Sequence, residues 1–257
     1  MLKYSVHGLT FNLYDSIKEL PSSVYQKAKQ YDVLASELAY TKEMLDQQKA
    51  QLGLLRELGS KPQAAQLEIN IRLSEGLIEA NFRPDRLAWA TYVKWNRRMS
   101  ESELDEHITE LLGKGLTDEY IGDMMSRVNQ KISGEVRRYF KSRNKQGKTL
   151  NEAERYRQYL LAKLTWYQEP TDENKQKYKS LLRQMLEARP ILSFDGEDSV
   201  IVELEKNYAK LCVSLTECGC PDPARLTVFE LYTWLETQEE KYEAHKKALT
   251  KDAPKRR

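Results

Sequence analysis

Hydrophobic and polar residues alternate along residues 2–13, and the two-residue stretch His7-Gly8 separates the two halves. Alternation with period two places one set of side chains on one face of a strand, and a short glycine-containing turn is typical of a β-hairpin. The apolar set consists of Leu2, Tyr4, Val6, Leu9, Phe11 and Leu13. Because an isolated hairpin is only marginally stable in water, we expect it to lie on helices or to pair with the edge of another chain.

After the hairpin the pattern changes from strand to helix at Pro21. Asp15 can cap one turn of helix, and Pro21 ends that turn because the residue before a proline is displaced from helical backbone angles. Either of the two serines that follow can cap the next helix, which the apolar spacing predicts to span residues 23–58. We therefore predict that residues 1–20 are a peripheral attachment and not part of the core. A hinge at Pro21 would place this attachment against one long helix.

The remaining chain shows the three-four spacing of amphipathic helices. Apolar residues nearly surround the predicted helix at 86–99, so we expect that helix near the centre of the core. Ser100 with Glu103, and Thr227 with Glu230, have the spacing of a capping box. The predicted helices span residues 63–81, 86–99, 101–112, 118–143, 150–168, 172–188, 199–216 and 227–249.

These elements define an all-α protein, mainly a helical bundle, with a short N-terminal β-hairpin. The composition agrees, since the 257 residues include only 11 glycines and 8 prolines. The polar, glycine-containing segment 144–148 is the best candidate for a boundary. We predict a hairpin-plus-helix domain at residues 1–148 and a C-terminal helical domain at residues 149–257.

Composition and charge narrow the functional classes. The net charge of +2 creates no overall field that would direct the chain to nucleic acid or to a membrane. No apolar run approaches the ~20 residues that span a bilayer, and no signal-peptide core follows Met1. The three cysteines Cys212, Cys218 and Cys220 form a poor disulfide framework. These features favour a cytoplasmic protein.

Motifs that carry chemistry are missing from the sequence. There is no phosphate-binding glycine loop, no nucleophile elbow and no His-Glu-x-x-His. His7 falls in the predicted turn, and His107 and His245 fall on charged helix faces. The cysteines number three where structural zinc takes four ligands, so whether they bind a metal stays open. We predict a protein that is not an enzyme and that has no cofactor and no metal site.

One segment is strongly basic. Residues 127–148 hold eight lysines and arginines and a single acid, Glu135, with Tyr139 and Phe140 between them. Such a segment could follow a phosphate backbone, but cations also suit the C-terminal end of a helix, where they face the negative pole of the helix dipole. The candidate nucleic-acid contacts are Arg127, Lys131, Arg137, Arg138, Lys141 and Arg143.

The first half of the chain resembles a family of largely uncharacterised structural and tail-assembly proteins of tailed bacteriophages. The resemblance rests on Tyr14-Asp15, on Leu20-Pro21 and on the later pattern Pro84-x-x-Leu87-Ala88. It implies a non-enzymatic phage assembly or virion-associated protein in the host cytoplasm or in the virion. The most concrete form is a tail-assembly chaperone that shields a helical client.

Amphipathic helices with few reactive groups suit such a binding role. The resemblance implies other phage structural proteins or a helical client as partners, and a second copy of the chain is a further candidate. We predict no membrane partner, and we keep a nucleic-acid-associated role for segment 127–148 as the alternative function. The predicted partner-binding residues are Tyr31, Leu34, Leu38, Phe229, Tyr232 and Trp234.

Overall fold

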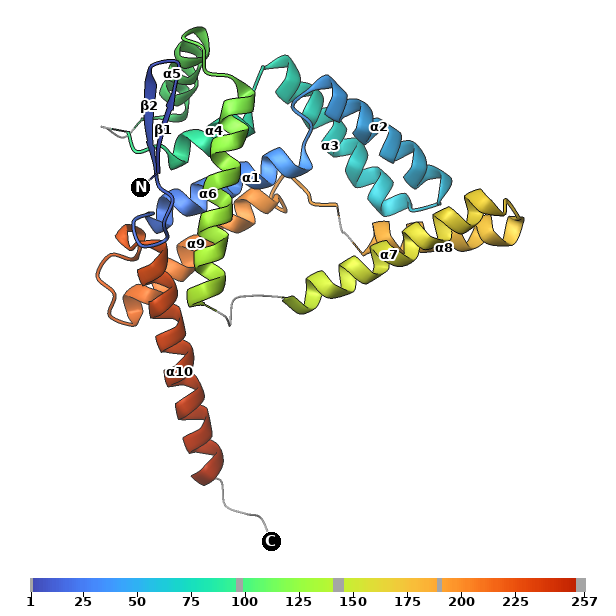
Figure 1. The fold of residues 1–257 in the computed structure, drawn as a ribbon. Coiled ribbons are helices and arrows are strands. Elements are labelled where there is room, and N and C mark those ends of the chain that lie inside the picture. Colours follow the sequence, from blue (N-terminus) through green and yellow to red (C-terminus); the bar gives the residue numbers. More distant parts are fainter. Residues whose placement is uncertain (1, 96–98, 141–145, 189–190, 253–257) are drawn as a thin grey trace. The chain divides into compact units, whose positions relative to one another are not determined.

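The computed structural model describes the backbone of residues 2–95, 99–140, 146–188 and 191–252, with the side chains of all of these except 146–153 and 248–252 (Figure 1). The fold is all-α with an N-terminal two-stranded hairpin, which confirms the predicted class. The elements are β1 (Leu2–Val6), β2 (Leu9–Leu13), α1 (Ser22–Glu37), α2 (Lys42–Glu57), α3 (Lys61–Glu79), α4 (Pro84–Tyr92), α5 (Glu101–Gly113), α6 (Asp118–Tyr139), α7 (Gln146–Gln168), α8 (Asp172–Glu187), α9 (Val200–Glu217), the 3₁₀ helix η2 (Pro223–Arg225) and α10 (Val228–Asp252).

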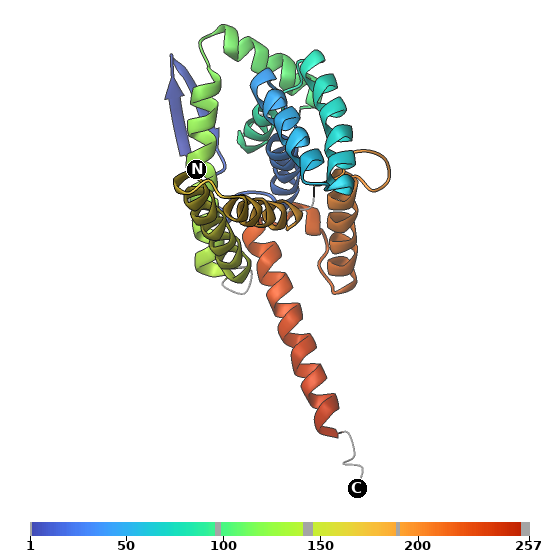
Figure 2. The ribbon, with the colours of Figure 1, turned by 90° about the vertical axis from the view of Figure 1, so that its right-hand side faces the viewer.

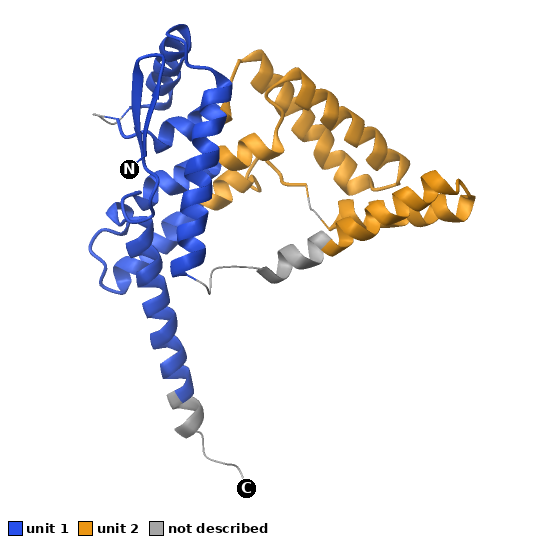
Figure 3. Ribbon diagram, viewed as in Figure 1, with its two compact units in different colours: residues 1–30, 86–141, 206–257 blue, residues 31–85, 142–205 orange. Residues whose placement is uncertain are grey.

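Backbone contacts divide the chain into two compact units (Figure 3). Unit 1 consists of residues 1–30, 86–141 and 206–257, and unit 2 consists of residues 31–85 and 142–205. These units describe how contacts cluster and not which segments fold independently. The predicted boundary between residues 148 and 149 therefore stays a prediction.

The predicted β-hairpin forms in unit 1, with Tyr4 opposite Phe11 and Val6 opposite Leu9. His7 and Gly8 form the turn, and both have positive φ angles, of 47° and 79°. This left-handed backbone matches the twist of a tight hairpin and suits glycine at the second position. The hairpin is thus built as the alternation of apolar residues predicts.

The outer edge of β2 pairs with the segment that follows α4. Tyr14 donates its backbone N–H to the carbonyl of Tyr92 at 2.8 Å, and Lys94 donates to the carbonyl of Asn12 at 2.8 Å. This pairing needs extended backbone after Tyr92, so α4 ends there. The predicted continuation of that helix to residue 99 is therefore wrong for residues 93–95.

Residues 13–20 enter the core of unit 1. Leu13, Ile17 and Leu20 are fully buried. The start of α10 also binds this segment, since Val228 donates its backbone N–H to the carbonyl of Leu20 and Phe229 donates to that of Ile17, both at 2.9 Å. The N-terminal stretch, which the sequence suggested as an attachment, is an integral part of this core.

Two acidic side chains join the N-terminal stretch to α6. Glu135 accepts hydrogen bonds from the Ser16 hydroxyl at 2.9 Å and from the Ile17 backbone N–H at 2.8 Å. The side chain of Asp15 is only 4% exposed and is paired with the Lys131 ammonium. Burial by itself would raise the pKa of Asp15, but the hydrogen bond and the charge of Lys131 hold that pKa below its usual value.

Replacement of this carboxylate should give a pH-dependent loss of stability. At pH 7 we expect Asp15→Asn to lower the free energy of unfolding by about 2 kcal/mol, since a charge-assisted hydrogen bond is lost. Because the folded pKa lies below the unfolded value of about 4, this stabilisation is present above pH ~4 and disappears as the pH falls through the folded pKa. Urea unfolding between pH 7 and pH 3 measures it.

The matched control is Asp46→Asn, which alters an exposed carboxylate on α2. We expect the control to match the wild type throughout this pH range. A constant difference between Asp15→Asn and the wild type at all pH values would contradict the assignment.

Helix α4 lies at the centre of unit 1, as predicted. Trp89 is fully buried, and its ring meets that of Phe11 edge-on at 5.2 Å between centroids and that of Trp95 at 6.3 Å. Trp95 in turn meets His107 of α5 at 5.1 Å. These perpendicular ring pairs connect the hairpin, α4 and α5.

The predicted helix over residues 23–58 is wrong, because the structure divides it into α1 and α2. The break follows Glu37, and Thr41 caps the new helix by accepting a hydrogen bond from the backbone N–H of Met44 at 3.3 Å. Ser74 of α3 holds the chain at the break, since its hydroxyl accepts from the N–H of Ala39 at 2.9 Å.

Helices α2 and α3 form an antiparallel pair within unit 2. Leu186 at the end of α8 and Ile191, which follows that helix, also pack against their shared core. It contains Leu52, Leu55, Ala64, Leu67 and Ile71, with Leu45, Leu186 and Ile191 packed against them. The buried Asn70 is satisfied, since its amide donates to the carbonyl of Leu192 at 2.9 Å and accepts from Gln66 at 3.2 Å.

Within unit 1, α10 begins in the core and continues beyond the other helices (Figure 2). Its first turn is capped by Thr227 and Glu230, whose side chains bond reciprocally as the predicted capping box requires. Residues 239–247 of the helix are all exposed.

Candidate functional site

Helices α7 and α8 form a helical hairpin in unit 2. Pro170 lies in the connection, and Thr171 caps α8 by accepting a hydrogen bond from the backbone N–H of Asn174 at 3.2 Å. Ala162 of α7 and Leu182 of α8 are the buried side chains of the described part of the hairpin. So few buried residues leave most of the large side chains of α7 accessible.

A row of aromatic rings follows one side of the hairpin. Consecutive ring centroids are 6.0, 5.7, 5.3 and 5.2 Å apart. The order of the row is Tyr156, Tyr159, Tyr178, Trp166 and Tyr167. Burial raises the pKa of Tyr178, and the neighbouring Tyr159 adds to that shift. The row joins the two helices through the contacts of Tyr178 with Tyr159 and Trp166.

The outward face of α7 is apolar and exposed. Its members recur at intervals of four, four and three residues, which places them on one face of a helix. They are Tyr156, Leu160, Leu164 and Tyr167, with exposed fractions of 53%, 37%, 57% and 64%. We call these four residues the α7 stripe. Ala162, two residues from both leucines, lies on the opposite side of the helix and faces α8.

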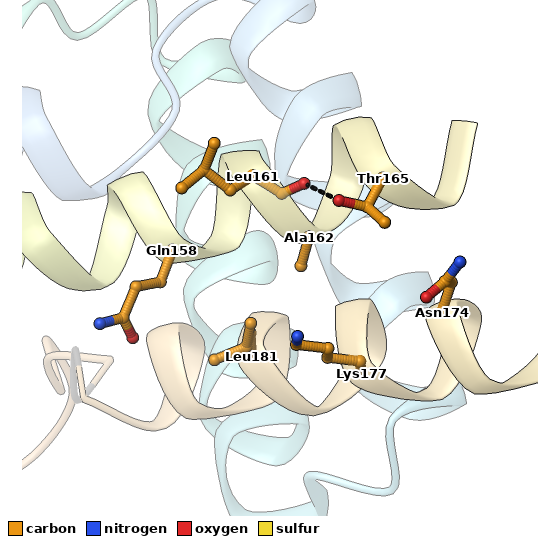
Figure 4. Close-up of a pocket in the computed structure, with 7 residues that line it drawn as sticks. All are labelled: Gln158, Leu161, Ala162, Thr165, Asn174, Lys177 and Leu181. Carbon is orange, nitrogen blue, oxygen red and sulfur yellow. Dashed lines mark hydrogen bonds between the residues drawn. The ribbon is translucent and has the colours of Figure 1, made fainter. Parts of the chain in front are cut away.

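A shallow cleft of about 340 Å³ lies between α7 and α8 (Figure 4). It is lined by Gln158, Leu161, Ala162, Thr165, Asn174, Lys177 and Leu181. Leu161 is 51% exposed and lies next to the α7 stripe, so the apolar surface continues into the cleft. Among the described residues of the lining, Lys177 alone is titratable. A cleft of this composition can receive a side chain, but it offers no acid and base pair for catalysis.

The two helices of the hairpin carry a one-sided charge. Residues 155–167 and 174–183 contain seven cations and no aspartate or glutamate. The cations are Arg155, Arg157, Lys163, Lys175, Lys177, Lys179 and Arg183. Acids lie only in and beside the turn between the helices and at the base, where Glu154 pairs with Arg157 at 3.5 Å and Glu187 pairs with Arg183 at 2.7 Å. The α7 stripe therefore lies in a positive environment.

The three binding residues predicted in α1 are mostly inaccessible. Tyr31 and Leu38 are buried in unit 2, and Leu34 is half-buried. A partner could reach only Leu34 without moving the helix.

The three binding residues predicted in α10 are half-buried in unit 1. Phe229 meets the rings of Tyr139 and Phe140 at 5.5 and 5.6 Å, and Tyr232 meets Phe140 at 5.2 Å. Trp234 packs against the cluster of Leu215, Cys220 and Leu231. These rings join α6 and α9 to α10.

The basic residues predicted on α6 are partly neutralised. Arg127 pairs with Asp123 at 3.1 Å, and Lys131 pairs with Asp15. Arg137 and Arg138 are exposed. Lys141 and Arg143 lie outside the described residues, so the structure places only four of the six candidate contacts.

The cysteines and histidines do not meet in a metal site. Across the described residues, no three side chains among His, Cys, Asp and Glu come together in a group that could hold a metal ion. Cys220 is buried and Cys218 is exposed. Burial raises the pKa of the half-buried Cys212, which keeps its thiol protonated and makes it a poor ligand.

The α7 stripe is absent from the candidates that the sequence supplied. Its signal was present, because α7 has apolar residues both at Ala162 and on the opposite face, a pattern typical of a helix that is covered on two sides. The absence of acids from residues 155–167 was a second signal for a binding surface on α7. It is weaker than the charge of the basic segment 127–148.

Comparisons of the chain with protein-family models, with curated proteins and with solved structures found no match. Over the part of the chain that the structure describes, no helix combines the length and the apolar content needed to cross a membrane.

Proposed function

We propose that the protein is a non-enzymatic binding protein whose α7–α8 hairpin holds a helical segment of another protein. The observation that carries the proposal is the α7 stripe with Leu161, which together expose five large apolar side chains on one helix. Contiguous exposed apolar surface of this kind marks interaction sites in soluble proteins. An amphipathic helix is the partner that fits a linear stripe beside a shallow cleft.

The finer form of the proposal comes from the phage resemblance of residues 14–88. It makes the protein an assembly factor or a virion component of a tailed phage, most concretely a tail-assembly chaperone, acting in the host cytoplasm or in the virion. Its partners would be other phage structural proteins. A chaperone that shields a client needs an accessible apolar surface, and the α7 stripe is exposed in the isolated chain.

The alternative, a nucleic-acid-associated role for α6, has less support. Exposed Arg137 and Arg138 favour it, but the ion pairs of Arg127 and Lys131 remove two of the cations from the binding surface. Fewer available cations mean fewer phosphate contacts and weaker binding.

Replacement of the leucines of the stripe tests the proposed function. The double variant Leu160→Ser/Leu164→Ser should lose about 2 kcal/mol of binding free energy, or about 30-fold in affinity, for a client helix. The measurement is co-expression with the long helical tail proteins of the same gene cluster, followed by titration of the purified complex.

The matched control is Val213→Ser on α9, which removes a side chain that is 59% exposed and lies in unit 1. The control should bind as the wild type does. Equal affinity of the double variant and the wild type, or no complex with any tail protein, would refute the proposal.

A further inference from the structure

We propose that the helix bound by the α7 stripe carries carboxylates along both edges of its own apolar face. This inference rests on the proposed function and adds the chemistry of the partner. It follows from the cations beside the stripe. A purely apolar contact would not require these cations.

Cations border the stripe on both sides. Arg157 lies three residues before Leu160 and Lys163 lies three residues after it, so the two cations occupy opposite edges of the α7 stripe. Arg157 shares a weak, exposed ion pair with Glu154 at 3.5 Å. The Lys163 ammonium lies over the ring of Tyr167, 5.9 Å from its centroid, which positions its charge at the edge of the stripe.

The other cations of the hairpin strengthen the same field. Arg155, Lys175, Lys177 and Lys179 are exposed, and none of them pairs with a carboxylate of the described residues. Covering the α7 stripe with a neutral or basic helix would remove water from Arg157 and Lys163, the two cations at its edges, without compensation. A partner with carboxylates at its edges supplies the compensation and speeds association.

A second copy of the chain is a poor occupant of this surface. If two copies met through their α7 stripes, Arg157 and Lys163 of one copy would face Arg157 and Lys163 of the other. Residues 155–167 contain no acid that could offset this repulsion. Like charges placed face to face disfavour such an interface. The field therefore selects a different, acidic partner.

Single-stranded nucleic acid fits less well than an acidic helix. Several of the ring faces that would stack on bases are occupied, because Tyr178 lies between Tyr159 and Trp166 and Lys163 lies over Tyr167. The exposed leucines Leu160, Leu161 and Leu164 have no role in contact with phosphates.

Two synthetic helical peptides test the proposal on the full-length protein. Both have the same leucine stripe, and the edge positions are glutamate in one peptide and lysine in the other. By fluorescence anisotropy we expect the glutamate peptide to bind at least ~10-fold more tightly, with an affinity that falls as salt rises. The variant Arg157→Glu/Lys163→Glu should reverse this preference. The control Lys210→Glu, at an exposed site on α9, should leave it unchanged.

The outcomes separate this inference from the proposed function. If both peptides bind equally and Leu160→Ser/Leu164→Ser abolishes both, the apolar surface stands and the charge preference is overturned. If neither peptide binds, both proposals fail. If a single-stranded oligonucleotide displaces the glutamate peptide and still binds the leucine double variant, the surface recognises phosphates and the inference is overturned.

Discussion

Removal of residues 1–20 is expected to unfold unit 1 of the protein. The deleted stretch buries Val6, Phe11, Leu13, Ile17 and Leu20. Each such side chain is worth about 2–4 kcal/mol, so their sum approaches or exceeds the ~5–15 kcal/mol that holds a typical domain together. The deletion also leaves the backbone N–H groups of Val228 and Phe229 without acceptors at the start of α10. Circular dichroism and urea unfolding measure the loss of helix and of cooperativity.

The double substitution Lys3→Ala/Ser5→Ala serves as the control, because it alters the same strand only at exposed positions. It should leave the unfolding transition within about 0.5 kcal/mol of the wild type. Near-native helix content and a normal transition in the deletion variant would mean that the N-terminal stretch is an attachment after all.

Trp89→Ala should lower the free energy of unfolding by about 4 kcal/mol, the largest effect that we expect from a single substitution. The ring is fully buried and contacts Phe11 and Trp95, so its loss leaves a cavity where the hairpin meets α4. Urea unfolding followed by circular dichroism measures the change.

Trp89→Phe is the matched variant. The buried indole N–H of Trp89 has no hydrogen-bond partner among the described residues, so a phenyl ring loses only part of the volume and no hydrogen bond. We expect a loss of about 1–2 kcal/mol, clearly less than for alanine. Equal losses for the two variants would show that the aromatic contacts contribute little to stability.

Local sequence signals predicted several helix starts correctly. Ser100 and Thr227 form the capping boxes that their spacing indicated. These signals work because a cap is a contact between residues three apart. The division of α1 from α2 was missed, because it depends on the distant Ser74, which bonds the chain at Ala39. The end of α4 depends in the same way on pairing with β2.

The candidate site was harder to predict than the fold. An amphipathic pattern identifies apolar residues, but it does not say whether the rest of the protein covers them. Tyr31 and Leu38 turned out to be buried, whereas Leu160 and Leu164 of the same residue class are accessible. Packing between residues far apart in sequence decides which face of a helix is covered. The apolar pattern of one sequence does not contain that information.

The hydrogen bonds between residues 17–22 and 226–229 also bear on how the protein is made. Unit 1 draws on the beginning, the middle and the end of the chain, and the acceptors at Ile17 and Leu20 receive their donors only from α10. During synthesis the N-terminal hairpin therefore leaves the ribosome long before the helix that completes its core. Most of the α2–α3 core comes from neighbouring residues, and Leu186 and Ile191 join it later. The pair can therefore begin to form first, and unit 1 closes last, after the residues of α10 have been translated.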